Sequence, residues 1–294
     1  LRTYYYQGCI YQNMGNKTLA MESFVKAISE GCESNDMLTM ARTYFAQGTI
    51  YFSLYEWDDY IETNKNAASY FKQAEKYNSY ANCLIRIING YTLNDDAENA
   101  LSYINECKQM LGVISDKRVA DFYSAYLIYV TKYGTNQEIE SFINDYINII
   151  TDSFKDWLTL CNAYYKIGKY EEALHATEQY RSSTNARDEL KYKALISMIY
   201  EKTDRYEESL RAYKEFMVVS DSTNLAIMRQ DTKFVEERHN LEMAKARETE
   251  AKNRLTIIVL GCAVALMASL YIINLIRKRL KKSRVENAQL LSEK

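Results

Sequence analysis

The sequence predicts an all-α protein built from repeated helical hairpins, and three observations support this prediction. The 294 residues include no proline and only 9 glycines, whereas β-rich chains and loop-rich enzymes need those residues at their turns. Hydrophobic residues make up 47% of the chain and charged residues 26%, which is typical of a folded protein rather than a disordered one. Aromatic and small residues also recur along residues 1–219 at a nearly constant spacing.

Six units with this recurring pattern begin at residues 4, 44, 84, 122, 157 and 193. The first unit is the clearest and places aromatic or small residues at Tyr4, Gly8, Tyr11, Ala20, Phe24 and Ala27. The pattern resembles the tetratricopeptide repeat, a helix–turn–helix unit of about 34 residues. The resemblance implies a right-handed α-solenoid of about six repeats over residues 1–219. The residues after it predict a long helix that runs into one transmembrane helix.

The repeats depart from the family pattern in two respects. Their starts are 35 to 40 residues apart, and the second unit fits only if extra residues lengthen the connection around Trp57–Thr63. The proline that usually closes each repeat is absent throughout. We therefore expect polar capping residues and turn residues to end the helices.

Stacked repeats of this family form a superhelix whose first helices line a concave face. Aromatic and amide side chains on such a face suit an extended peptide, because amides hydrogen-bond its backbone while rings cover its side chains. Packing between repeats is the alternative role for many of these positions. The residues expected on the concave face are Arg2, Tyr5, Arg42, Phe45, Asn82, Asn89, Tyr123, Leu127, Leu158, Asn162, Tyr165 and Met198.

Charge and motif content argue against nucleic-acid binding and catalysis. The net charge of −2 hides an acidic body, since residues 1–254 hold 30 basic and 37 acidic side chains. An acidic body lacks the basic face that phosphate contacts need. The chain has 2 histidines and no nucleotide-binding or hydrolase motif, and its 6 cysteines lack the spacing of metal ligands. We expect no enzyme activity, metal or cofactor, and we interpret the cysteines as packing residues, although a disulfide is the alternative.

Residues 220–254 are expected to form a capping and juxtamembrane helix. The polar cluster at 220–223 is a helix-start signal, and no glycine or proline follows before Arg254. Ile227, Phe234 and Leu241 recur every seven residues, and the first two are expected to cover the open end of the last repeat. The apolar stripe stops after Leu241, so a free-standing coiled coil is only weakly supported.

Residues 255–276 contain no charged side chain and are predicted to cross a membrane. A helix of this length spans roughly 33 Å, which matches a hydrocarbon core of about 30 Å. Gly261, Ala265 and Ser269 are four residues apart and share one helix face. Small residues at this spacing let two membrane helices approach closely, which predicts a homodimer contact, although small residues are also common in membrane helices in general.

The basic residues around this segment predict its orientation. Six of them lie within fifteen residues on the C-terminal side and four on the N-terminal side. The positive-inside rule then places residues 277–294 in the cytoplasm and the repeats outside it. Because the chain begins without methionine inside an expected helix, we expect a preceding segment, and we expect the basic tail to be truncated.

These patterns together resemble bacterial single-pass membrane regulators with tetratricopeptide repeats. The resemblance implies a protein of the bacterial inner membrane whose extracytoplasmic solenoid binds a peptide or protein partner and relays a signal through one span. The expected partners are such a ligand, membrane lipid and a second copy of the chain, with no nucleic acid. The alternative function is a passive, membrane-tethered scaffold for the assembly of envelope proteins.

Overall fold

The computed structural model describes residues 1–31, 36–180 and 186–221, and in addition residues 247, 249–261, 267, 269 and 276–278. The side chains of residues 186 and 187 are not described. The chain divides into two compact units, Leu1–Phe234 and Val235–Lys294. All regular secondary structure in the described residues is helical, which confirms the predicted all-α class.

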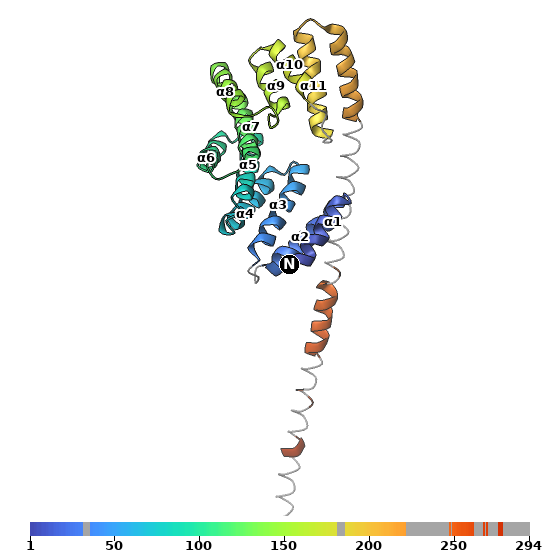
Figure 1. Ribbon diagram of the computed structural model, residues 1–294. Coiled ribbons are helices and arrows are strands. Elements are labelled where there is room, and N and C mark those ends of the chain that lie inside the picture. The colour runs from blue at the N-terminus through green and yellow to red at the C-terminus, as the bar shows by residue number, and fades with distance from the viewer. Residues whose placement is uncertain are drawn as a thin grey trace, which may run out of the picture. The chain divides into compact units, whose positions relative to one another are not determined.

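The helices of the first unit pack as successive hairpins (Figure 1). Five hairpins are α1 (Arg2–Asn13) with α2 (Lys17–Gly31), α3 (Met37–Ser53) with α4 (Trp57–Gln73), α5 (Tyr77–Leu93) with α6 (Ala97–Lys108), α7 (Asp116–Tyr133) with α8 (Asn136–Ile149), and α9 (Trp157–Lys166) with α10 (Tyr170–Gln179). In the sixth, α11 (Ala186–Lys202) is followed by the helical residues 206–221. These pairs match the six predicted repeat units.

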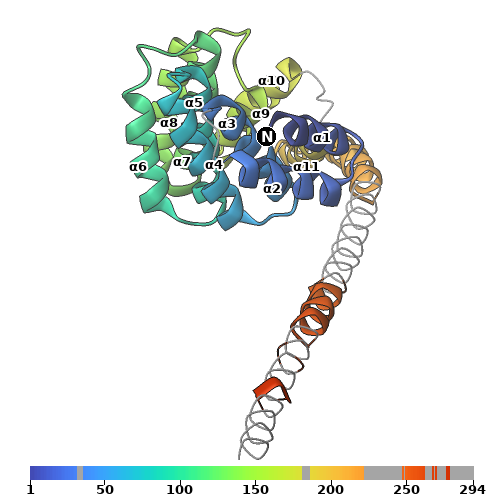
Figure 2. The same cartoon turned by 90° about the horizontal axis from the view of Figure 1, so that it is seen from below.

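The order of the contacts is that of a solenoid. The second helix of a hairpin packs against the first helix of the next, as α4 does against α5. First helices also contact one another, α5 with α7, α7 with α9 and α9 with α11. In the views of Figures 1 and 2, α6 and α8 lie on the outside of the stack and α5 and α7 lie further in. Side chains of the first helices can therefore gather on one inner face.

The packing of the first hairpin follows the repeat pattern. Ala20, Phe24 and Ala27 are fully buried. A Cβ atom built on Gly8 would lie 2.4 Å from the Phe24 ring, so α1 and α2 approach more closely than a side chain at this position permits. Gly48 likewise allows α3 and α4 to approach closely, because an added Cβ would lie 2.7 Å from the Asn64 amide nitrogen.

Six of the described turns between helices contain a left-handed residue, and the three turns from α3 to α6 are equally short. Three residues separate α3 from α4, α4 from α5 and α5 from α6. Each of these turns contains one residue with φ between 55° and 60°. The positive-φ residues of the described chain are Gly15, Tyr55, Glu75, Asp95, Gly168 and Asp204.

The predicted long connection around Trp57–Thr63 is wrong, because these residues form the start of α4. The extra length of this repeat lies in its helices, since α3, α4 and α5 have 17 residues each. Because the turns on either side of α4 have only three residues, the extra residues of this repeat lengthen its helices. Longer helices bury a larger face against their neighbours.

Polar side chains cap several helices, as expected for a chain without proline. The side chains of Asp36, Asp96, Thr135 and Asp156 accept hydrogen bonds from backbone N–H groups at the starts of α3, α6, α8 and α9. Thr135 and Glu138 form a reciprocal capping box at the start of α8. Each of these four helix starts therefore has a partner for one of its unpaired donors.

The predicted membrane span falls largely outside the described residues. Residues 249–261 are helical, while residues 262–266, 268 and 270–275 are not described. Within the described residues, no helix combines the length and apolar character needed to cross a bilayer. Gly261 and Ser269 lie in helical positions and are exposed, and Ala265 is outside the described residues, as are Ile227, Phe234 and Leu241. Residues 220 and 221 continue the helical stretch that begins at residue 206, so the predicted helix start is wrong at these two positions. The span, the capping and juxtamembrane role of residues 220–254 and the dimer contact remain predictions.

Candidate functional site

The helices α7, α9 and α11 enclose a pocket of about 740 Å³. Part of its wall is apolar, with side chains from all three helices, and the rest carries carboxylate, amide, hydroxyl and ammonium groups. The pocket is lined by Ile128, Asp156, Leu158, Thr159, Asn162, Tyr165, Tyr180, Asp188, Lys191, Ala194, Leu195 and Met198. An apolar pocket of this size with a few convergent polar groups is typical of a ligand-binding site.

Four predicted groove residues come together in this pocket. They are Leu158, Asn162, Tyr165 and Met198. Asn162 and Met198 are exposed and Leu158 and Tyr165 are half-buried, so all four can reach a ligand.

The prediction for α7 is one residue out of place. Leu127 is fully buried in the core that α7 shares with α8 and α9, so it cannot contact a ligand. The next residue, Ile128, is 37% exposed and lines the pocket. The repeat pattern is weak in this unit, and a shift of one residue turns a helical side chain by about 100°.

Ile128 and seven further lining residues, apolar and polar, lie outside the predicted set. Lys191, Ala194 and Leu195 precede Met198 at helical spacings, so the face of α11 could have been extended from Met198 alone. Asp156 and Tyr180 lie at helix ends, where the repeat pattern carries no signal.

A buried tyrosine positions the start of α9 beside the pocket. The Tyr146 hydroxyl accepts a hydrogen bond from the Asp156 backbone N–H at 2.8 Å and lies 3.0 Å from the Ser124 hydroxyl. Burial raises the pKa of Tyr146, so the hydroxyl stays protonated at neutral pH. The Asp156 carboxylate in turn accepts hydrogen bonds from the Thr159 backbone N–H at 3.1 Å and from the Thr159 hydroxyl at 2.7 Å. These contacts join α7, α8 and α9 at the pocket rim.

Four further predicted residues lie on α3 and α5. Arg42 is exposed, while Phe45, Asn82 and Asn89 are half-buried. One face of the Phe45 ring is covered, because the Arg86 guanidinium lies 4.0 Å from the ring centroid and donates to the Phe45 carbonyl at 3.0 Å. These residues do not line the pocket between α7, α9 and α11.

The remaining predicted residues pack against their own neighbours. The Tyr123 ring stacks on Phe142 of α8, with 6.1 Å between the centroids. Tyr5 packs beside Phe24, and burial together with a hydrogen bond to Cys9 raises the Tyr5 pKa to about 12.

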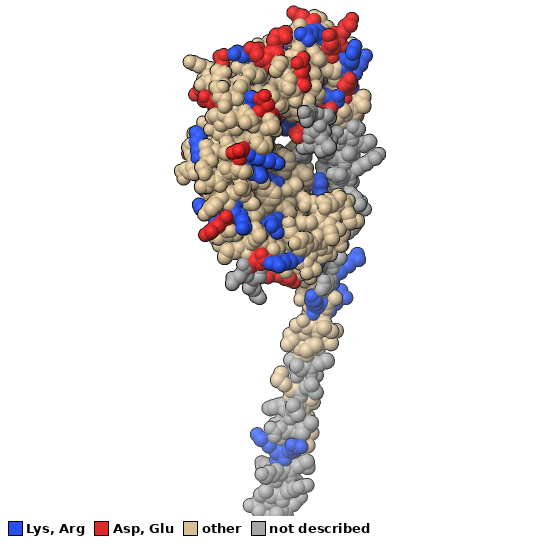
Figure 3. All heavy atoms as spheres, viewed as in Figure 1, with Lys and Arg blue, Asp and Glu red and all other residues tan. Residues whose placement is uncertain are grey.

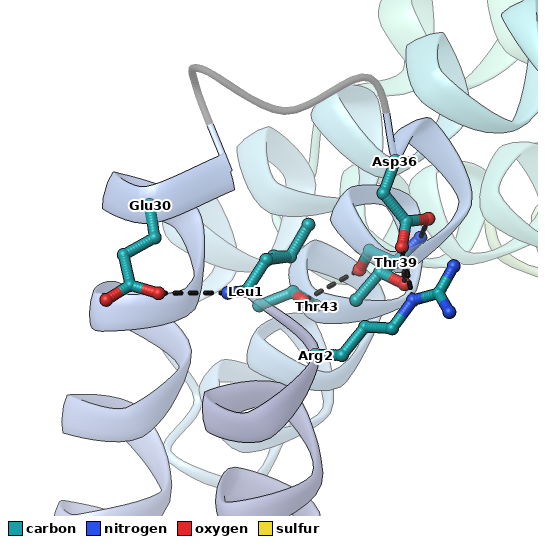
Figure 4. Close-up of polar contacts among 6 residues, drawn as sticks. All are labelled: Leu1, Arg2, Glu30, Asp36, Thr39 and Thr43. Atoms are coloured by element: carbon teal, nitrogen blue, oxygen red, sulfur yellow. Dashed lines mark hydrogen bonds and ion pairs between the residues drawn. The ribbon is translucent and has the colours of Figure 1, made fainter.

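Arg2 ties the first hairpin to the second. Its Nε donates to the Asp36 carboxylate at 2.6 Å, while Asp36 also accepts from Thr39 at the start of α3 (Figure 4). Arg2 therefore forms a contact between the first two hairpins. Of the twelve predicted groove residues, four line one pocket.

The described residues contain no group of three or more His, Cys, Asp or Glu side chains placed to hold a metal ion. Cys83, Cys107 and Cys161 are free, buried thiols, and burial raises the pKa of each to about 12. They belong to the hydrophobic clusters of the core, which agrees with the packing interpretation of these three cysteines.

Comparison with known proteins gives matches in structure only. No protein-family model and no curated protein matches the chain. A Rap protein solved in complex with competence and sporulation factor is 15% identical and aligns with a TM-score of 0.50, covering 77% of this chain and 75% of that chain. A tetratricopeptide repeat protein from Parabacteroides merdae is 14% identical, with a TM-score of 0.41 and coverage of 78% and 97%. Together with the six stacked hairpins, the likeness to the Rap structure shows that this protein has the tetratricopeptide-repeat fold.

Proposed function

We propose that the solenoid binds an extended peptide, or an extended segment of a protein, in the pocket between α7, α9 and α11. The pocket itself carries this proposal, because about 740 Å³ of space is lined both by apolar side chains and by the Asn162 amide. The apolar wall takes up ligand side chains, and the amide hydrogen-bonds a peptide backbone. The Rap structure of similar fold holds competence and sporulation factor, which is consistent with ligand binding by such a solenoid.

Membrane attachment and signal relay form the second part of the proposal and are supported by the sequence. The uncharged residues 255–276 anchor the chain in a bacterial inner membrane, with the repeats outside the cytoplasm. Ligand binding alters the helix over residues 223–254, and two spans in contact at Gly261, Ala265 and Ser269 carry that change inward. The double substitution Gly261→Leu and Ala265→Leu should weaken self-association in a membrane reporter, and unchanged association would contradict the paired spans.

Peptide binding is tested with the full chain in lipid nanodiscs. A random peptide library is panned against loaded nanodiscs, with empty nanodiscs used to remove lipid-binding peptides. The dissociation constants of the selected peptides are then measured by fluorescence polarisation. Met198→Asp should raise them about tenfold or more, which corresponds to about 1.4 kcal/mol, because a carboxylate in the apolar wall is desolvated by the ligand.

A matched control is Tyr213→Asp, which places the same charge at a side chain that is 50% exposed and outside the pocket lining. Its peptide affinity should equal that of the unmodified chain. Circular dichroism checks that both variants are folded. Selected peptides that bind Met198→Asp as tightly as the unmodified chain would exclude this pocket as the binding site.

A further inference from the structure

The pocket between α7, α9 and α11 adjoins a second hollow at the start of α9. This hollow has a volume of about 770 Å³ and is lined by Asp152, Ser153, Lys155, Asp156, Trp157, His175, Gln179 and Tyr180. Asp156 and Tyr180 line both spaces. The two spaces therefore lie side by side and share the wall that Asp156 and Tyr180 form, with the apolar face of α11 in one space and the Trp157 ring in the other.

Aromatic rings and carboxylates lie together in the second hollow. Trp157 and Tyr180 supply the rings, and the Tyr180 ring is held by stacking on Tyr192, with 4.7 Å between the centroids. Asp152 and Asp156 supply the carboxylates, and both are exposed. A ring face and a carboxylate are the two groups that bind a guanidinium, the ring through cation–π attraction and the carboxylate through paired hydrogen bonds.

The chain already places one cation among these groups. The Lys155 ammonium donates to the Asp152 carboxylate at 2.7 Å and lies 5.6 Å from the centroid of the Trp157 ring. The Lys155 side chain is 8% exposed, whereas Asp152 is 82% exposed. A carboxylate accepts several hydrogen bonds, so Asp152 retains exposed acceptor positions beside the ring.

The charge around these two spaces favours a basic ligand. Three carboxylates, those of Asp152, Asp156 and Asp188, line the two spaces against the ammonium groups of Lys155 and Lys191. The side chains that line the two spaces thus carry one more negative than positive charge, which favours a cation. Figure 3 shows acidic side chains, with basic side chains among them, over the end of the solenoid that carries α10 and α11.

We propose that the bound segment carries an arginine side chain in the second hollow, close in sequence to a large apolar side chain in the pocket on α11. The arginine guanidinium lies against Trp157 and pairs with Asp152, while the apolar side chain contacts Met198 and Leu158. This inference rests on the proposed peptide-binding function and specifies the chemistry of its ligand.

The test uses peptides selected on the full chain in nanodiscs, as above. Selected sequences should be enriched in arginine next to a large apolar residue. Each arginine peptide is synthesised again with citrulline, which keeps the shape of arginine and removes its charge. Citrulline should weaken binding to the unmodified chain at least fivefold. Asp152→Asn should weaken binding of the arginine peptide to a similar degree and leave binding of the citrulline peptide unchanged.

The control variant is Asp59→Asn, which removes an exposed carboxylate from the first turn of α4, outside both linings. It should not alter binding of either peptide. If Asp152→Asn weakens both peptides equally, or if the selected peptides lack basic residues, the arginine site is wrong. In either case sensitivity to Met198→Asp would leave the proposed peptide binding intact. If Met198→Asp has no effect, or if no peptide is selected, both proposals fail.

Discussion

At the scale of single residues, the turns of this solenoid hold non-glycine residues in a conformation that glycine adopts most easily. Glu75 has φ 55° in the turn between α4 and α5, and its side chain is exposed. Gly168 has φ 79° in the turn between α9 and α10, where an added Cβ would meet no atom within 4 Å. The left-handed region costs an L-residue roughly 1–2 kcal/mol. Substitutions at Glu75 and Gly168 therefore change the backbone strain with little change in side-chain packing.

We predict that Glu75→Gly stabilises the protein and that Gly168→Ala destabilises it. In Glu75→Gly, relief of the left-handed strain outweighs the greater entropy of glycine in the unfolded chain by up to about 1 kcal/mol. Gly168→Ala introduces that strain and should lower the free energy of unfolding by about 1 kcal/mol. Urea unfolding monitored by circular dichroism measures both. Glu75→Ala is the control, since it removes the same side chain and keeps the strain. A Glu75→Gly variant no more stable than Glu75→Ala would contradict the prediction.

The buried thiols allow a second prediction at this scale. Because burial raises the pKa of Cys83, Cys107 and Cys161 to about 12, almost none of these groups is a thiolate at pH 8. The thiolate is the reactive form, so the three cysteines should resist alkylation by iodoacetamide in the folded protein. In urea they should react fully. Peptide mass spectrometry reads each site separately, and rapid alkylation of Cys83 in the folded chain would contradict the buried core position.

At the scale of helices, the sequence predicted polar capping residues, and the structure has them at several helices. The sequence also placed the extra residues of the second repeat in a connection, and that prediction was wrong. Asp36 and Asp156 cap helices as a chain without proline requires. The repeat pattern placed small residues at Gly8, Ala20 and Ala27, where α1 and α2 pack closely together. It placed extra residues in a connection at Trp57–Thr63, since periodicity records the length of a repeat and not its division between helix and turn.

The cap of α3 also predicts how stability depends on pH. The hydrogen bond from Arg2 and those from Thr39 hold the pKa of Asp36 below its usual value of 3.8. The stabilisation from the ionised carboxylate is therefore present above about pH 4 and is lost as the pH falls through the lowered pKa of the folded state. Asp36→Asn keeps a capping side chain and removes the charge. It should cost up to about 1 kcal/mol at pH 7.

The difference in stability between the unmodified protein and Asp36→Asn should shrink as the pH falls below 4, because protonation of Asp36 progressively removes the charge that the variant lacks. Thermal unfolding at pH 7, 4 and 2 measures it. A constant difference at all three values would mean that packing, rather than charge, accounts for the effect.

At the scale of the whole solenoid, stability is distributed unevenly among the repeats. The largest group of buried apolar residues spans α3 to α7 and includes Phe71, Leu84, Ile88 and Phe122. The first hairpin contributes to a smaller cluster around Phe24. In a linear array each hairpin is stabilised by its neighbours, so a hairpin that shares a smaller buried cluster with its neighbour is less stable than the hairpins of the large cluster.

Hydrogen exchange followed by mass spectrometry should therefore find the slowest backbone exchange in α4 and α5. Exchange in α1 should be at least tenfold faster, which corresponds to a difference of about 1.4 kcal/mol in the free energy of opening. Uniform protection from α1 to α9 would show that the array opens only as a whole.

The sequence by itself predicted the helical class, the repeated hairpins and four side chains that line one pocket, those of Leu158, Asn162, Tyr165 and Met198. These features depend on which side chains are apolar, small or aromatic at a repeated spacing, which is a local property of the chain. Tertiary structure alone decided that Ile128 and not Leu127 faces the pocket, and that Asp156 and Tyr180 line both this pocket and a second hollow. Those facts depend on the angle at which each hairpin stacks on the next, which is set by side chains distant in sequence.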